Sequence, residues 1–181
     1  MENLQANNTE LIEDNEIERI KKEKRRRAME LFRQGYNCSQ SIVMTFAEEV
    51  GLDPSAAVRI ASSFGGGMGR LREVCGAVSG MFMIAGYKFG YGDPKDFEAK
   101  KRHYALIQEL AGRFREKNGS IVCRELLTKG PGSGASDPTP TERTEEYYKK
   151  RPCPELIGDA AEMLAEYIAL RERDGDPAQE G

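Results

Sequence analysis

The sequence lacks the features that would place the protein in a membrane or on nucleic acid. Its longest nearly apolar run covers residues 74–87, which is shorter than the roughly 20 residues a bilayer-spanning helix needs. We therefore expect no membrane insertion. The formal net charge is only −3, which gives no general attraction to nucleic acid. The polar, acidic N-terminus lacks the basic and then apolar layout of a secretion signal, so a cytoplasmic location is expected.

The sequence also lacks the common local motifs of catalysis. His103 is its only histidine, so no histidine triad is indicated. The glycine run Gly65–Gly69 lacks the Gly-Lys-Ser/Thr ending of a phosphate-binding loop and follows no strand. No Cys-x-x-Cys pair occurs, which excludes the local thioredoxin, zinc-ribbon and ferredoxin patterns.

Helical periodicity without any strand signal predicts an all-α fold, a compact bundle of about five to six helices with a long N-terminal helix. The expected helices cover residues 11–33, 38–50, 54–64, 75–89, 96–117 and 153–173, with a short helical segment at 121–127. We divide the chain into a polar N-terminus with a long exposed helix (1–35), a four-cysteine helical redox domain (36–171) and a disordered tail (172–181). The basic run at residues 21–27 is interpreted as a solvated helix face.

Glycine decides two local features. The run Gly65–Gly69 is predicted to be a turn, because each glycine in a helix interior costs about 1 kcal/mol relative to alanine. Gly76 and Gly80 are four residues apart, which lets another backbone approach closely, so we place the helix at 75–89 in the bundle centre. Residues 130–143 are rich in Gly, Pro, Ser and Thr and form an unusually long loop.

The chemistry of the chain is concentrated in its cysteines, Cys38, Cys75, Cys123 and Cys153. They are separated by 37, 48 and 30 residues, so only the fold can assemble a joint site. Each falls in or next to the first turn of a predicted helix, where the free N–H groups and the helix dipole stabilise a thiolate. A thiolate is both a nucleophile and a metal ligand. The alternative is four separate buried cysteines.

Five segments carry a resemblance to a known family: YNCSQSIV around Cys38, FGGGMGR, CGAVSG from Cys75, CRELL from Cys123 and CPELIGDAAEML from Cys153. Over residues 36–170 the chain resembles the C_GCAxxG_C_C family of redox-active proteins. The resemblance implies a redox role. A related region of split-Soret cytochromes binds an iron–sulfur cluster, which implies that all four cysteines here are ligands of a [2Fe–2S] centre.

Three functions follow as hypotheses. The first is a [2Fe–2S] electron-transfer centre with the four cysteines as metal ligands. The second is a metal-free thiol–disulfide oxidoreductase in which the cysteines are redox thiols and Cys75 is the nucleophile. The third is a structural zinc or helical interaction module. In each, Gly66, Gly67 and Gly76 let the chain pass close to the site, and Arg70 or Arg72 supplies positive potential. The expected partner is an unidentified redox protein, and the N-terminal helix is a candidate surface for a homo-oligomer or a docked partner.

Overall fold

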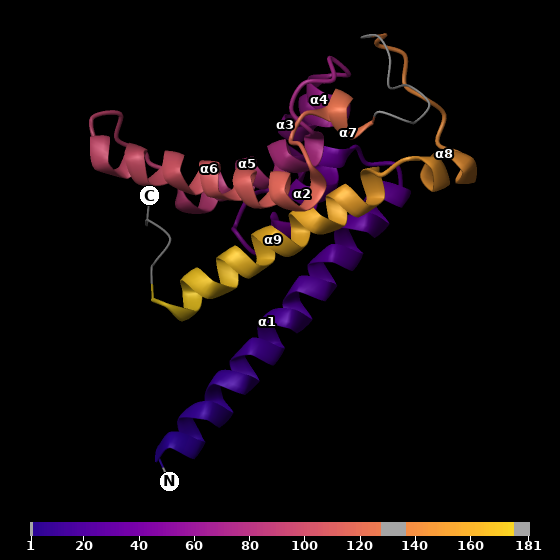
Figure 1. The fold of residues 1–181 in the computed structure, drawn as a ribbon. Coiled ribbons are helices and arrows are strands. Elements are labelled where there is room, and N and C mark those ends of the chain that lie inside the picture. The colour runs from indigo at the N-terminus through magenta and orange to yellow at the C-terminus, as the bar shows by residue number, and fades with distance from the viewer. Residues whose placement is uncertain (1, 128–136, 176–181) are drawn as a thin grey trace.

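The computed structural model describes residues 2–127 and 137–175, with side chains from residue 13 onward in those ranges. The described chain is helical and contains no strand beyond one isolated antiparallel bridge, Val74–Val122. Its main helices, labelled in Figure 1, are α1 (Glu2–Arg33), α2 (Cys38–Phe46), α3 (Pro54–Ala61), α5 (Gly76–Phe89), α6 (Phe97–Asn118) and α9 (Cys153–Arg173). Shorter segments are η1 (Ser62–Phe64), α4 (Gly65–Met68), α7 (Cys123–Leu126) and α8 (Glu145–Lys150). The prediction of an all-α bundle with a long N-terminal helix is confirmed.

Capping residues set most helix starts where the sequence predicted them. The Asn37 side chain accepts a hydrogen bond from the Gln40 N–H, and the Gln40 side chain accepts one from the Asn37 N–H, which forms a complete capping box. Asp53 caps α3 with Pro54 in its first turn, and Asp96 caps α6.

The helix ends differ more from the predictions. Helix α1 begins at Glu2 rather than residue 11, and α2 ends at Phe46 rather than residue 50. Helix α8 was not predicted, because its six residues, EEYYKK, are too few to show an amphipathic period.

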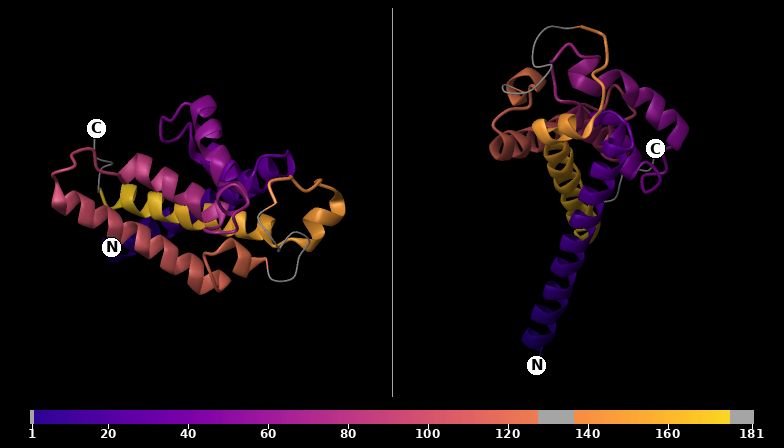
Figure 2. Two further views of the ribbon diagram at one scale, coloured as in Figure 1. Left: turned by 90° about the horizontal axis from the view of Figure 1, so that it is seen from above. Right: turned by 90° about the vertical axis from the view of Figure 1, so that its right-hand side faces the viewer.

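Helices α1 and α9 lie side by side over the C-terminal half of α1, as Figures 1 and 2 show. Their contact buries Ala28 and Phe32 of α1 in the main core. The basic run at residues 21–27 takes part in this contact, because Arg25 pairs with Asp159 at 2.7 Å and Lys21 with Glu166 at 2.9 Å. Only part of the run is therefore the solvated face that the sequence suggested.

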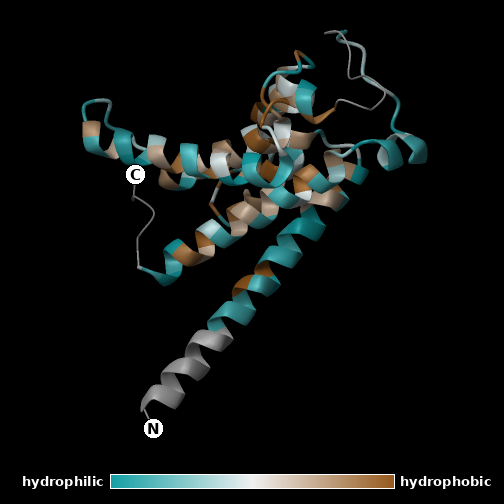
Figure 3. Ribbon diagram, in the orientation of Figure 1, coloured by the Kyte–Doolittle hydropathy of each residue, from teal (hydrophilic) through white to brown (hydrophobic). Residues whose placement is uncertain are grey.

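Helix α5 lies in the centre of the bundle, and its residues from Gly76 to Met81 are all buried. A Cβ atom added to Gly80 would lie 2.9 Å from the Cβ of Ile42 in α2. The small residues of α5 thus allow α2 to approach at backbone distance, as predicted. Figure 3 shows apolar residues gathered where these helices meet, whereas the coloured part of α1 is mostly hydrophilic.

One end of the bundle collects the features that build the site. Helices α3, α4, α7 and α8 lie near the N-terminal ends of α2 and α9 (Figure 1). Residues 130–136 of the predicted loop at 130–143 lie outside the described residues. Residues 137–143 are described, and they run along this end of the molecule without helix or strand. Within the described ranges, no helix combines the length and the apolar content that crossing a bilayer requires.

Candidate functional site

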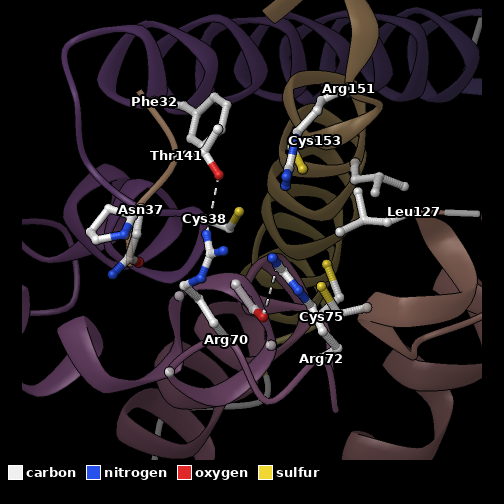
Figure 4. A pocket seen from close by; sticks show the side chains of 18 of the residues that line it. Phe32, Asn37, Cys38, Arg70, Arg72, Cys75, Leu127, Thr141, Arg151 and Cys153 are labelled. Carbon is white, nitrogen blue, oxygen red and sulfur yellow. Dashed lines mark hydrogen bonds between the residues drawn. The ribbon is translucent and has the colours of Figure 1, made fainter. Parts of the chain in front are cut away.

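All four cysteines line one cavity of about 290 Å³ at this end of the bundle. None is in a disulfide; Cys75, Cys123 and Cys153 are buried, and Cys38 is half-buried. Figure 4 shows Cys38, Cys75 and Cys153 around the cavity, on three different elements. The fold therefore joins residues that are 30 or more positions apart in the chain.

Cys38 is placed by the start of α2. The Asn37 cap fixes the first turn, and its Nδ2 donates to the Ser62 carbonyl at 3.0 Å, which ties α2 to the segment before the glycine turn. A Cβ on Gly76 would lie 2.9 Å from both the Cys38 Cβ and the Phe64 carbonyl oxygen. Gly76 therefore lets the start of α5 come close enough to Cys38 for both to line one cavity.

Cys75 and Cys123 are placed by the short antiparallel bridge. The Cys75 N–H donates to the Ile121 carbonyl at 2.8 Å, and the Cys123 N–H donates to the Glu73 carbonyl at 2.6 Å. Gly67 is packed against Cys123, because a Cβ on Gly67 would lie 2.6 Å from the Cys123 Cβ. Two cysteines that are 48 residues apart are thus carried by one local backbone pairing.

Cys153 is the first residue of α9 and the most acidic of the four thiols. A hydrogen bond from the Cys38 thiol, together with the nearby Arg151 guanidinium, lowers the pKa of Cys153 to about 7, although burial acts in the opposite direction. The same contact raises the pKa of Cys38 well above its usual value, since Cys38 is held as the donor of that bond. Cys153 is therefore the cysteine that ionises most readily, and Cys38 is the protonated donor of their hydrogen bond.

The other two cysteines are held protonated. Burial raises the pKa of Cys75 to about 12, despite hydrogen bonds from the backbone N–H groups of Ala77 and Val78. Burial also raises the pKa of Cys123, and contact with the Arg72 guanidinium opposes that rise. The prediction that Cys75 is the nucleophile finds no support in these pKa values, because a thiolate is the attacking form and Cys153 is the cysteine that supplies it.

The glycine turn forms one wall of the cavity. Gly66, Gly67 and Gly69 have φ values of 65°, 73° and 60°, which lie outside the range of a right-handed helix. The backbone therefore turns here, as predicted, although the hydrogen bonds of Gly65–Met68 are those of one helical turn. Arg70 and Arg72 also adopt positive φ, at 71° and 64°, a conformation that L residues avoid. All four residues predicted near a bound group line the cavity: Gly66, Gly67, Arg70 and Gly76.

Sequence reasoning missed two arginines of this site. Arg151 lines the cavity two residues before Cys153, and its guanidinium lies 4.8 Å from the Tyr147 ring centroid. A basic residue just before a cysteine that begins a helix was the available signal. Arg143 donates to the Phe32 and Tyr36 carbonyls at 3.0 and 2.7 Å. Nothing in the loop composition indicated that contact.

The placement of the thiols bears on whether they hold a metal. Among the described residues, no group of three or more His, Cys, Asp or Glu side chains is placed to hold one metal ion. A tetrahedral zinc site and a [2Fe–2S] cluster each need four such ligands at one site, so this observation applies equally to both groups. The four thiols that line the cavity have the donor chemistry for either group.

Comparison with known proteins identifies a family for this chain. No curated protein and no solved structure gives a significant match. One family model, described as "Putative redox-active protein (C_GCAxxG_C_C)", matches residues 36–167. The matched range includes all four cysteines, the glycine turn and the central helix α5. The chain therefore belongs to the C_GCAxxG_C_C family of redox-active proteins.

Proposed function

We propose that this protein is a thiol–disulfide oxidoreductase in which Cys153 attacks a disulfide and Cys38 resolves the intermediate. The observation that carries the proposal is the hydrogen-bonded contact between these two cysteines, with Cys153 as the low-pKa partner. A thiolate reacts fastest when its pKa is near the ambient pH, and the pKa of Cys153 is about 7. The resolving thiol is already next to the sulfur that it must attack.

The reaction proceeds in two exchanges. The Cys153 thiolate attacks one sulfur of the substrate disulfide, the substrate S–S bond breaks, and the departing thiolate takes a proton from solvent to become a thiol. Cys38 then loses its proton to solvent and attacks the Cys153 sulfur, which breaks the mixed disulfide and releases the second substrate thiolate, and this thiolate also takes a proton from solvent. The two cysteines end as a Cys38–Cys153 disulfide, oxidised by two electrons, and the substrate ends as two thiols. A cellular thiol reductant returns the pair to the dithiol state.

The charges around the pair support this direction of attack. Arg151 lies beside Cys153 and lowers its pKa, so it also stabilises the negative charge on sulfur before attack. Cys153 lies at the N-terminus of the 21-residue helix α9, where the helix dipole favours an anion. Cys38 occupies the same position in α2, which helps it to become a thiolate once Cys153 is no longer charged.

The test is thiol release from a small disulfide, with every cysteine followed by mass spectrometry. The reduced wild-type protein is expected to release two thiols and to acquire a Cys38–Cys153 disulfide. Cys38→Ser is expected to stop at a mixed disulfide on Cys153 after one thiol, and Cys153→Ser to release none above the solvent rate. The matched variants Cys75→Ser and Cys123→Ser keep the attacking and resolving thiols and are expected to release two. Wild-type release by Cys153→Ser would show that the proposed attacking residue is wrong.

A [2Fe–2S] electron-transfer centre is the second candidate, because all four thiols line the same cavity. Cys38, Cys75, Cys123 and Cys153 would hold it, and the cluster would supply one-electron transfer. The arginines of the wall would offset the negative charge of four thiolates. Iron content and visible absorption of anaerobically prepared protein separate the two candidates. Iron that is lost equally in all four single Cys→Ser variants supports the cluster, whereas iron-free protein that releases thiols supports exchange.

A further inference from the structure

The wall of the cysteine cavity is strongly cationic. Four arginines line it, Arg70, Arg72, Arg143 and Arg151, and none of its described lining residues is aspartate or glutamate. A cavity walled by low-dielectric protein and by charges of one sign concentrates ions of the opposite sign. The thiols therefore face a space that favours anions.

Two of these arginines already use their N–H groups to hold the chain around the cavity. Arg70 donates from Nε to the Asp137 carbonyl at 2.6 Å and from Nη1 to the Thr141 hydroxyl at 3.3 Å. Arg143 donates to carbonyls at the end of α1, and its guanidinium lies 4.6 Å from the centroid of the Phe32 ring. Their side chains contribute charge to the cavity and hold the segment at residues 137–143 in place.

Arg72 is different. Its side chain is buried, with 4% of the residue exposed, and Nη1 donates to the Gly66 carbonyl at 3.4 Å. The guanidinium contacts the Cys123 thiol, but within the described residues Nε and Nη2 have no oxygen or nitrogen hydrogen-bond partner. A buried guanidinium with two unsatisfied donors is costly unless something accepts from them. Figure 4 shows Arg72 and Arg151 entering the cavity from opposite sides, with Cys153 beside Arg151.

The two unsatisfied atoms belong to one edge of the guanidinium. The N–H bonds of Nε and Nη2 run parallel, and this edge matches the two oxygens of a carboxylate or of another oxyanion. The backbone of Arg72 is held at a φ of 64°, and backbone strain of this kind is found preferentially at ligand sites.

We propose that the cavity binds a small carboxylate-bearing disulfide, with the carboxylate on the Nε/Nη2 edge of Arg72 and a substrate sulfur facing Cys153. The proposal rests on the thiol exchange proposed above and names its substrate class. The cavity volume of about 290 Å³ is that of a small-molecule site, since pockets for such ligands begin near 300 Å³. Exchange follows the two steps given above, and the carboxylate takes no part in the electron balance.

The first experiment compares three small disulfides that differ in charge: 3,3′-dithiodipropionate, the neutral 2-hydroxyethyl disulfide and the cationic cystamine. The wild-type protein is expected to react at least about tenfold faster with the dicarboxylate than with cystamine. Arg72→Gln is expected to lose most of that ratio. Arg72→Lys keeps the charge but loses the parallel donors, and it is expected to recover only part of the ratio. Arg102→Gln, on the exposed surface of α6, serves as the matched control.

The second experiment measures anion preference without any disulfide. Alkylation of Cys153 by iodoacetate and by neutral iodoacetamide is compared by mass spectrometry, with and without added propionate. Preference for iodoacetate in the wild type, its loss in Arg72→Gln and slower alkylation with propionate support the anion site. A wild type without charge preference, or an Arg72→Gln variant that keeps it, overturns the inference. If no disulfide reacts while iodoacetate is still preferred, the exchange function and with it the disulfide substrate are wrong, and only an anion site at Arg72 remains.

Discussion

Removal of the Cys38 thiol should raise the pKa of Cys153. The hydrogen bond from Cys38 is the largest cause of the lowered pKa of Cys153, ahead of Arg151. The pKa of Cys153 is lowered from 9.0 to about 7, and each pKa unit corresponds to about 1.4 kcal/mol. A hydrogen bond to a charged group is worth about 1.5–3 kcal/mol. We therefore expect Cys38→Ala to raise the pKa of Cys153 by at least about one unit.

The assay is the pH dependence of Cys153 alkylation by iodoacetamide, read site by site by mass spectrometry. The wild-type rate should have its midpoint near pH 7, and the midpoint of Cys38→Ala should lie about one unit higher. Near pH 7 the thiolate fraction of Cys153, and with it the rate, would fall about fivefold. Cys38→Ser keeps a hydroxyl donor at the same position and should keep most of the lowered pKa.

The same shift predicts how stability depends on pH. The folded-state pKa of Cys153 lies below its unfolded value, so its thiolate stabilises the fold fully above about pH 9 and progressively less as the pH falls through 7. Cys38→Ala should reduce the gain in unfolding free energy between these two pH values. If the alkylation profiles of wild type and Cys38→Ala coincide, the hydrogen bond is not the cause of the reactivity of Cys153 and the proposed pair is wrong.

Two further substitutions test the packing that builds the site. Gly76→Ala would place a Cβ 2.9 Å from the Cys38 Cβ, so it should lower the unfolding free energy by about 1–3 kcal/mol and change the alkylation rate of Cys38. Arg25→Ala removes the 2.7 Å ion pair between α1 and Asp159 of α9, whose carboxylate is mostly buried, and should lower the unfolding free energy by about 1–2 kcal/mol after allowance for solvent screening. Both are measured by denaturant unfolding.

Controls for these two variants come from the same chain. Gly112 lies in α6 with nothing within 4 Å of an added Cβ, so Gly112→Ala should raise the unfolding free energy by up to about 1 kcal/mol. Arg26 is exposed, and the ion pair that it makes among the described residues is with Glu30, one turn away in the same helix, so Arg26→Ala should change the unfolding free energy by about 0.5 kcal/mol or less. Equal losses in Gly76→Ala and Gly112→Ala would refute the close contact at Cys38. Equal losses in Arg25→Ala and Arg26→Ala would show that the contact between α1 and α9 does not depend on Arg25.

Local sequence determined most of the helices, because their signals are local. Asn37, Asp53 and Asp96 cap α2, α3 and α6, and these three helices begin within one residue of the predicted starts. Gly80 indicated that α5 lies in the centre of the bundle, because a residue without a side chain lets the backbone of α2 pack directly against it. The four cysteines and the glycine turn also indicated the family, which the family model confirms.

Only the tertiary structure decided how the pKa values of the four cysteines differ. All four lie at or next to helix starts, so this position could not rank them, and Cys75 was favoured for its neighbour Gly76 and for the nearby arginines. Burial in the folded chain raises the pKa of Cys75, whereas contact with Cys38 and Arg151 lowers that of Cys153. Desolvation and pair contacts depend on which segments meet in space, and these segments are far apart in the chain. The sequence therefore identified the four cysteines as candidates, and the contacts made by the fold determined the direction in which each pKa is shifted.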